Sequence, residues 1–305
     1  MNYDIVILTC DQYVSPTPET QYVQNLLLED GLLQDHLEEF GLKVARKSWA
    51  DPIFDWSKAD FVIFRTTWDY HERLDEFIGW LGRASRLTKF INEFKLIQWN
   101  LDKHYLIDLK QKGIPVVPTR YVKPLSKTTL KSEMNVGGWE NAVLKPAVSS
   151  TSRHTYRIQP HNIDNHESVF QRLIREECMM IQPFVSSIQS IGEVSLVVIG
   201  GMYSHAVLKR AKLGDFRVQD DFGGTVEAYE PTPGEIALAE KAVDALPYAA
   251  IYARVDIVYS DDNQLWITEV ELLEPELFFR LKPEAAAQLS GIIHHHIFIK
   301  NSLNN

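Results

Sequence analysis

The order of short apolar runs along the chain limits its fold more than any other feature of the sequence. Residues 4–10 (DIVILTC) and 60–64 (DFVIF) have the composition of buried strands, and a helical pattern lies between them. This β-α-β order is typical of a parallel sheet. After residues 114–119 (IPVVPT), which contain two prolines, most apolar runs follow one another as strands. The sequence therefore predicts an α/β unit followed by α+β units with antiparallel sheets.

Helical periodicity organises the first third of the chain. A helix is expected over residues 20–40, ended by Gly41 as a C-cap, with an inward face made of Leu26, Leu33, Leu37 and Phe40. Residues 43–49 (KVARKSW) are expected to form a strand. Further helices are expected at about 75–85 and over 100–113.

The rest of the chain is richer in strands. The connection Gly200-Gly201 predicts a hairpin. Thr232 and Glu235 form a capping box with a proline between them, and the helix that follows is expected to turn Ile236, Ala239, Val243 and Leu246 inward. Strands are expected at residues 141–147, 178–185, 195–199, 202–209, 252–259 and 265–272.

The composition limits the functions that the chain can serve. Of 305 residues, 45% are hydrophobic and 24% charged, as is usual for a globular protein. The net charge of −10 argues against a nucleic-acid partner, and the two distant cysteines suggest neither a disulfide framework nor a metal site. No apolar run approaches the roughly 20 residues of a membrane helix, and the first residues read as a strand, not a signal peptide. We therefore expect no membrane partner and a cytoplasmic location.

Four glutamates stand in or beside one strand, within residues 267–279 (ITEVELLEPELFF). Glu269 and Glu271 share a face because they are two positions apart, and a short turn brings Asp256 of the preceding strand near them. Such a carboxylate trio suits magnesium, which takes oxygen ligands and shares its coordination with phosphates. From the spacing alone, a solvated acidic hairpin edge is an equally good interpretation.

Basic residues occur on the same predicted sheets. Lys145 and Lys209 stand at the ends of strands, Arg254 is two positions before Asp256, and Arg217 follows in a polar segment. Each alone reads as an ordinary surface cation. Together with the carboxylates they are what a nucleoside triphosphate with magnesium requires. The chain has no GxxxxGK[ST] motif, which excludes a P-loop NTPase.

Taken in order, six segments and the RTTWDYH stretch at residues 65–71 resemble the ATP-grasp ligases, and they cover essentially the whole chain. The resemblance is to glutathione-synthetase-like members, most closely to the group that contains the O-ureido-serine cyclo-ligase of cycloserine biosynthesis. It implies an ATP-grasp fold with an N-terminal Rossmann-like pre-ATP-grasp domain over residues 1–98. A small ATP-grasp subdomain would span 99–185, and a C-terminal subdomain with the metal site 186–305. The six segments are residues 102–119, 143–158, 180–185, 192–210, 252–258 and 268–275.

The resemblance also implies roles for individual residues. Lys103, Lys145 and Lys209 would bind the nucleotide, Arg254 its phosphates, and Glu193 would hold the nucleotide. The metal ligands would be Asp256, Glu269 and Glu271. The loop that covers the phosphates would contain Ser149, Ser150, Thr151 and Ser152, and the adenine hinge Gln182, Pro183, Phe184 and Val185.

Two departures from the family pattern stand out. The covering loop is usually rich in glycine, but here it is rich in serine and has no glycine. Its backbone amides can still cradle phosphate, with hydroxyl groups helping. The third metal ligand is commonly asparagine, but here it is Glu271, and this extra charge should tighten metal binding or raise the pKa of one carboxylate.

The reaction that the resemblance implies is an ATP- and Mg²⁺-dependent ligation of a carboxylate to an amine through an acyl phosphate, in an amino acid or small peptide. Lys145, Arg254 and Arg217 would act on the transferred phosphoryl group. The substrate site is expected after the strand at 60–64, with Arg65 pairing with a substrate carboxylate; an ordinary loop with a packed Trp68 is the alternative. The expected substrate residues are Arg65, Thr66, Thr67, Trp68, Asp69 and Glu274.

Several properties stay open at this stage. A non-catalytic ATP-binding regulatory module is the alternative function. The sequence does not identify the two substrates. It also does not decide whether the enzyme closes a ring or joins two molecules, or whether it prefers Mg²⁺ or Mn²⁺. Relatives of this kind often self-associate, so a homo-oligomer is possible. The run His294-His295-His296 is expected to be structural, because adjacent residues on a helix point to different faces.

Overall fold

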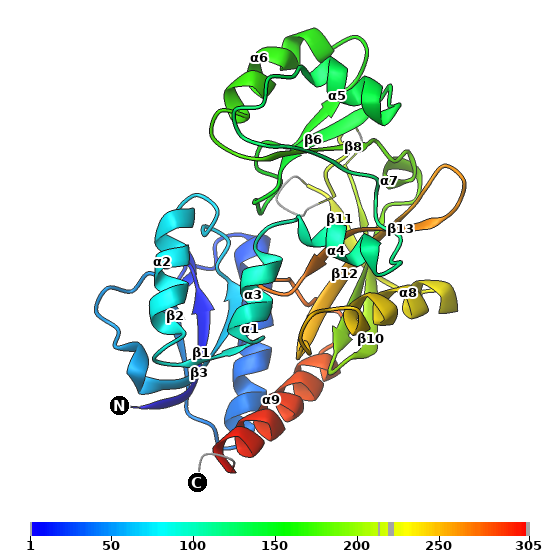
Figure 1. Cartoon of the computed structure of the whole chain (residues 1–305). Coiled ribbons are helices and arrows are strands. Elements are labelled where there is room, and N and C mark those ends of the chain that lie inside the picture. Colours follow the sequence, from blue (N-terminus) through cyan, green and yellow to red (C-terminus); the bar gives the residue numbers. More distant parts are fainter. Residues whose placement is uncertain (1, 213, 219–222, 303–305) are drawn as a thin grey trace.

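The N-terminal part of the chain is a parallel sheet with helices against it (Figure 1). The computed structural model describes residues 2–212, 214–218 and 223–302. The sheet has the order β2-β1-β3-β4, and the strands are Tyr3–Thr9 (β1), Val44–Ser48 (β2), Ala59–Thr66 (β3) and Lys89–Ile91 (β4). This confirms the parallel sheet, but β4 was not foreseen, because three residues are too few to show a periodic pattern.

Helix α1 (Gln21–Glu39) begins and ends where the sequence predicts. The Thr20 side chain accepts a hydrogen bond from the amide of Val23, and Gly41 follows the helix with a φ of 80°. The expected inward face is wrong in one position, because Phe40 is 46% exposed and stacks on His294. Helix α2 (Leu74–Ala84) lies at the expected place, and the short 3-10 helices are Asp11–Tyr13 and Trp56–Lys58.

The helix expected over residues 100–113 is confirmed only from residue 105 to residue 111, and its start is wrong. The structure has α3 (Phe94–Asn100), a turn, and then α4 (Tyr105–Gln111). The break depends on a distant part of the chain, because the Lys103 amide leaves the helical pattern and donates to the carbonyl of Ala147 at 2.9 Å. The carboxylate of Asp102 accepts from the amide of His104 at 2.9 Å. The break fixes Lys103 against the strand that carries Lys145.

The middle of the chain forms a small antiparallel sheet of order β5-β8-β6-β7, drawn in green at the top of Figure 1. Helices α5 (Leu130–Gly137) and α6 (Ile163–Leu173) pack on it and bury a core that includes Leu144 and Phe170. Its strands are Arg120–Val122 (β5), Ala142–Pro146 (β6), Tyr156–Ile158 (β7) and Met179–Pro183 (β8).

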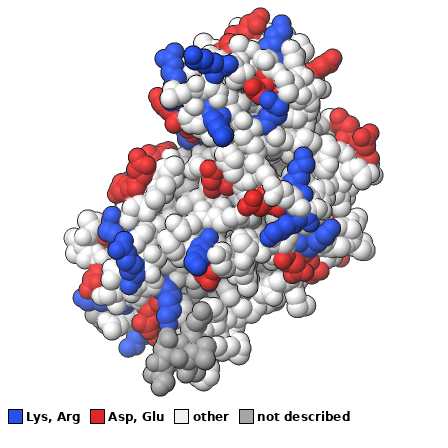
Figure 2. All heavy atoms as spheres, in the orientation of Figure 1, with Lys and Arg blue, Asp and Glu red and all other residues white. Residues whose placement is uncertain are grey.

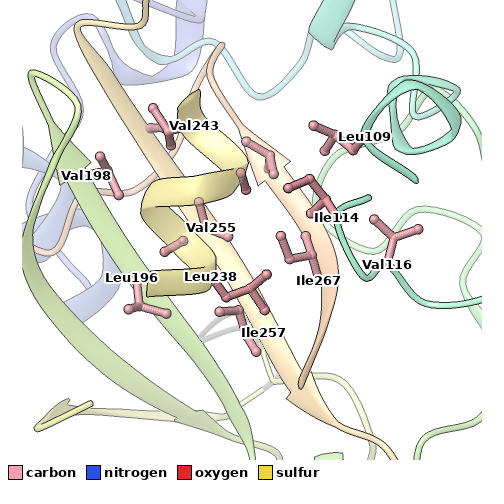
Figure 3. Close-up of a cluster of buried hydrophobic side chains, with 14 of the residues drawn as sticks. Leu109, Ile114, Val116, Leu196, Val198, Leu238, Val243, Val255, Ile257 and Ile267 are labelled. Carbon is pink, nitrogen blue, oxygen red and sulfur yellow. The ribbon is translucent and has the colours of Figure 1, made fainter. Parts of the chain in front are cut away.

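The last sheet is antiparallel and has the order β11-β10-β9-β12-β13. Helix α8 (Pro233–Asp244) lies across it, as Figure 3 shows, and the capping box of Thr232 and Glu235 is present. Ala239 and Val243 are buried as expected, with Leu238 beside them. Gly200 and Gly201 make the predicted hairpin with φ of 62° and 84°. The elements are Ser187–Ser190 (α7), Glu193–Ile199 (β9), Met202–Arg210 (β10), Thr225–Tyr229 (β11), Tyr252–Tyr259 (β12) and Leu265–Glu271 (β13).

The C-terminal helix α9 (Glu284–Ser302) returns to the N-terminal sheet and packs along α1 (Figure 1). Leu289 and Ile293 join one buried cluster with Leu33, Leu37 and Phe61. His294 stacks on Phe40 and His296 lies edge-on to Phe61, so these two have structural contacts. The expected domain limits at residues 98 and 185 fall between the sheets and stay a prediction. In the part of the chain that the structure describes, no helix is long and apolar enough to cross a membrane.

Candidate active site

A cavity of about 250 Å³ lies where the small sheet meets the last sheet. Most of the residues that the sequence singled out line it. Among the exceptions, Arg65 and Thr66 line a side pocket, and Thr67 and Asp69 line neither space. The lining residues from the sequence prediction are Trp68, Lys103, Lys145, Ser149, Ser150, Thr151, Ser152, Gln182, Pro183, Phe184, Val185, Glu193, Lys209, Arg217, Arg254, Asp256, Glu269, Glu271, Glu274 and Glu276.

Asp256 is the most heavily bonded carboxylate of the cavity. It is 3% exposed and accepts from Ser195 Oγ at 2.6 Å, Lys209 Nζ at 3.2 Å and Arg254 Nη2 at 3.0 Å. Burial alone would raise the pKa of Asp256, but the two cations and the serine hold it well below its usual range. Arg254 and Asp256 therefore share one face of β12, as the two-residue spacing predicts.

Glu269 and Glu271 stand on β13 opposite these two residues. The strand register pairs Asp256 with Glu269 and Arg254 with Glu271. Glu269 bonds Lys103 Nζ at 3.0 Å, and Glu271 is ion-paired with Arg254. Burial raises the pKa of Glu271 well above its usual value, with repulsion from Glu269 and Asp256 adding to it against the attraction of Arg254. This direction agrees with the prediction that the extra charge of Glu271 would raise the pKa of one carboxylate.

The three carboxylates do not converge as a ready-made metal site. Within residues 2–212, 214–218 and 223–302, no three His, Cys, Asp or Glu side chains are grouped so as to hold an ion. Each expected ligand instead faces a cation of the chain itself, which is the lowest-energy partner at hand for a buried carboxylate. The donor set still fits a hard divalent cation, because Glu269 and Glu271 both line the cavity and repel one another.

Basic side chains face these carboxylates across the cavity: Lys103, Lys145 and Lys209, together with Arg254. Lys209 Nζ lies 2.6 Å from Glu193, and Lys103 donates to the carbonyl of Ser149 at 2.7 Å. Lys145 is different, because no hydrogen bond or ion pair joins its ammonium group to the described residues. Burial lowers the pKa of Lys145, and the neighbouring Lys103 adds to this. A half-buried ammonium group that points into a cavity without a counter-ion is suited to bind an anion.

The serine-rich loop at residues 149–152 has an uncommon backbone. Thr151 and Ser152 have φ of 49° and 56°, in the left-handed region that glycine would adopt without strain. The following Arg153 fixes the loop by donating to Glu177 Oε1 at 3.0 Å and to the carbonyl of Val148 at 3.2 Å. The loop thus adopts the left-handed backbone conformation that is typical of a glycine-rich loop, and its serine and threonine residues line the cavity.

The hinge expected at residues 182–185 borders the apolar end of the cavity. Gln182 donates to Thr119 Oγ1 at 2.9 Å. The guanidinium of Arg157 lies over the ring of Phe184 at 3.7 Å, and the ring of Phe216 meets it edge-on at 6.0 Å. The Phe184 amide already donates to the carbonyl of Asn141 at 2.9 Å. That backbone donor is therefore not directed at the cavity.

Some of the expected substrate residues line the cavity, and others are bonded to protein groups away from it. Trp68 lines the cavity and donates from Nε1 to the carbonyl of Glu274 at 3.1 Å. Arg65 is 2% exposed and donates to the carbonyl of Pro275 at 2.9 Å, which ties the segment after β13 to the end of β3. Asp69 accepts from the indole of Trp49 at 2.7 Å. The guanidinium of Arg65 is not available for bidentate pairing with a substrate carboxylate, because protein groups already surround it.

Sequence reasoning missed several residues of the cavity. Ser195 does not line the cavity but donates to Asp256 from a place two positions after Glu193 on β9, so the period of two could have found it. Thr268 bonds Glu193 at 2.8 Å. Tyr22 and Phe278 also line the cavity, but they come from α1 and from the segment after β13, and nothing local in the sequence marks them.

The sheets, the cavity and the family comparisons together define the class of the protein as an ATP-grasp ligase. Residues 141–275 match the family model described as a RimK-like ATP-grasp domain. Residues 5–92 match the model described as the N-terminal domain of D-cycloserine synthetase DcsG. The cycloserine biosynthesis protein DcsG of Streptomyces lavendulae is 32% identical over 253 residues, which are 79% of this chain and 85% of the relative. The chain therefore belongs to the DcsG-like branch of the ATP-grasp ligases, enzymes that use ATP to form C–N bonds.

Solved structures agree with this family. The crystal structure of D-cycloserine synthetase DcsG has a TM-score of 0.85 and 27% identity, covering 96% of this chain and 99% of that one. D-alanine–D-alanine ligase from Bacillus anthracis complexed with ATP has a TM-score of 0.67 and 15% identity, covering 99% and 100%. This second likeness shows the fold alone. The relatives are synthetases and ligases, which gives no support to a non-catalytic nucleotide-binding module.

Proposed function

We propose that this ligase activates the carboxylate of an amino acid or small peptide with ATP and then joins it to an amine, in the same or a second molecule. A carboxylate oxygen attacks the γ-phosphorus of ATP, the bond to the β-phosphate oxygen breaks, and ADP leaves. The amine then attacks the acyl carbon and inorganic phosphate departs with the former carboxylate oxygen. The observation that carries the proposal is Lys145, whose ammonium group faces the cavity opposite a set of carboxylates and has no hydrogen bond or ion pair to any residue that the structure describes.

The chain's own residues would act by position and charge. Lys145, Lys103 and Arg254 would offset the negative charge of the phosphates, and Lys209 would keep Glu193 and Asp256 in place through its two ion pairs. Arg217 lines the same cavity beside Asp215, to which it donates at 2.7 Å. It would hold the acyl phosphate. The hydroxyl groups and amides of Ser149, Ser150 and Thr151 would cover the phosphates.

The remaining lining residues would hold the rest of the two substrates. The apolar end at Gln182, Pro183, Phe184 and Val185 would receive the adenine. Trp68 and Glu274 would face the substrate, and burial raises the pKa of Glu274 to about 7, with Glu269 adding to this. The expected contribution of Thr66, Thr67 and Asp69 would be to support the end of β3, since none of them lines the cavity.

We propose Mg²⁺ as the cofactor, with Glu269, Glu271 and Asp256 as its protein ligands. When bound, it would neutralise part of the negative charge of the phosphates. Support comes from the donor type and from the raised pKa of Glu271, which is caused first by burial and then by repulsion from Glu269 and Asp256. Releasing Glu271 from Arg254 would free that guanidinium for phosphate as well. We place the protein in the cytoplasm, which agrees with the free thiols of Cys10 and Cys178.

The test is phosphate release from ATP across a panel of amino acids, with hydroxylamine present to trap acyl phosphates as hydroxamates. We expect a carboxylate-dependent hydroxamate that disappears in Glu269→Gln. We expect Lys145→Met to lower kcat/KM for ATP at least about 100-fold, because it removes a charge that acts on the transferred group. The matched control is Lys131→Met, which changes an exposed lysine of α5, a helix that packs on the same small sheet as Lys145. Full activity of Lys145→Met or Glu269→Gln contradicts the assignment.

A further inference from the structure

Strand β13, which carries Glu269 and Glu271, lies at the edge of the last sheet. Its inner side pairs with β12, so the backbone groups on its outer side need other partners. The segment after α4 supplies them at Ile267, as can be followed in Figure 3. Val117 N donates to Ile267 O at 3.0 Å, and Ile267 N donates to Pro115 O at 2.9 Å. Further along β13, where the two glutamates stand, side chains take over this task.

Asn100 bonds the backbone on both sides of Glu271. Asn100 is buried at the end of α3; its Nδ2 donates to Val270 O at 2.7 Å, and its Oδ1 accepts from Leu272 N at 2.8 Å. These are the two bonds that one residue of a parallel neighbouring strand would make. Asparagine can make both because its carboxamide contains a donor and an acceptor, like a peptide group. The backbone at Glu271 is therefore held from its outer side by a single side chain.

Tyr105 bonds the residue between the two glutamates. It is buried at the start of α4, and its hydroxyl oxygen accepts from Val270 N at 3.0 Å. Asn100 and Tyr105 together therefore bond both backbone groups of Val270, whose neighbours are Glu269 and Glu271. Neither Asn100 nor Tyr105 is among the described residues that line the cavity. Any effect that they have on the site must act through the backbone of β13.

The same two residues flank the break between α3 and α4, which contains Lys103. The ammonium group of Lys103 lies 3.0 Å from Glu269 Oε1, and its carbonyl accepts from the hydroxyl of Tyr121 at 2.7 Å. The break is thus attached to β13 by Asn100 before it, by Lys103 within it and by Tyr105 after it. A cation expected to bind the nucleotide and two carboxylates expected to bind the metal are therefore fixed relative to one another.

We propose that Asn100 and Tyr105 are positioning residues that hold Glu269 and Glu271 close together, and that they thereby set the affinity of the enzyme for its divalent cation. The inference rests on the proposed function, since it concerns the metal ligands of the same site. Two neighbouring carboxylates repel one another, and a backbone that could shift would let them move apart. Holding the backbone keeps both oxygen donors in place before the metal arrives, which is the usual effect of groups behind metal ligands.

The test is Mn²⁺ binding to the full chain, followed by electron paramagnetic resonance with a non-hydrolysable ATP analogue present and corrected for Mn²⁺ bound by the analogue alone. We expect Asn100→Ala to weaken Mn²⁺ binding about 10–100-fold, the usual range for loss of a group behind a metal ligand. Tyr105→Phe, which removes one hydroxyl group and keeps the ring, should weaken it in the same direction. In both variants the Mg²⁺ concentration for half-maximal phosphate release should rise, while KM for the amino acid stays unchanged.

Two control variants separate positioning from folding. Leu109→Ala, in the core beneath α4, should lower Tm but keep the wild-type Mn²⁺ affinity, and the exposed Gln98→Ala should change neither. Wild-type affinity in both Asn100→Ala and Tyr105→Phe overturns the proposal, as does an equal loss in Leu109→Ala. Glu269→Gln, measured first, keeps the two proposals apart. If it binds Mn²⁺ as the wild type does, the metal assignment of the proposed function is wrong; if it alone loses affinity, only the positioning role is wrong.

Discussion

Replacing Asp256 with asparagine should destabilise the protein even without any ligand. The carboxylate is 3% exposed and is the shared counter-ion of Lys209 and Arg254. Removing one partner of a buried ion pair costs about 3–5 kcal/mol, because the other charge stays buried. Both cations keep a second carboxylate, Glu193 for Lys209 and Glu271 for Arg254, and asparagine can still bond Ser195. The loss should therefore lie at the lower end, about 3 kcal/mol.

The assay is thermal unfolding in the presence of a chelator, where this loss corresponds to a fall in Tm of roughly 5 °C. The pKa of Asp256 is depressed in the folded state, so its contribution is complete above the unfolded pKa of about 4 and is lost as the pH falls below it. The difference between wild type and variant should thus be equal at pH 7 and pH 6. Asp262→Asn, in the exposed turn of the same hairpin, should change Tm little. Equal shifts for the two variants would refute the reasoning.

Two further outcomes follow from burial. His205 is buried, which lowers its pKa to about 4, so the folded state binds a proton less readily than the unfolded state. The free energy of unfolding should therefore be highest above about pH 6.5 and should fall as the pH drops toward 4. His205→Gln should flatten that part of the profile of Tm against pH. Leu289 is fully buried between α9 and α1, so Leu289→Ala should cost about 3 kcal/mol in chemical unfolding, against little for the exposed Gln288→Ala; equal costs would contradict the packing of α9.

Periodicity and spacing predicted much of the framework. The paired strands β12 and β13 and the two-residue spacing of Arg254 and Asp256 were readable, because a strand places alternate residues on one face. The family resemblance then supplied Lys103, which no local pattern marks. Its position depends on a helix break made by a backbone bond to Ala147, a contact from another sheet.

What could not be predicted depends on long-range contacts. Arg65 follows a buried strand, where a ligand site is expected, yet Glu29, Asp30 and the carbonyl of Pro275 surround it. Glu29 and Asp30 stand three and four positions after Leu26, so the helical period places them on the inward face of α1, although charged residues are usually exposed. The acidic residues can be buried there because arginines from β2, from β3 and from the segment after β13 meet them.

The packing of α9 on α1 has a consequence for synthesis. The first sheet of the chain emerges from the ribosome early, but Leu289 and Ile293, which cover its buried cluster, come from the last twentieth or so of the sequence. Domains made first usually fold first. Here the earliest unit keeps an uncovered apolar surface until α9 has been translated, so nascent chains stalled before α9 should depend on chaperones more than chains that include α9.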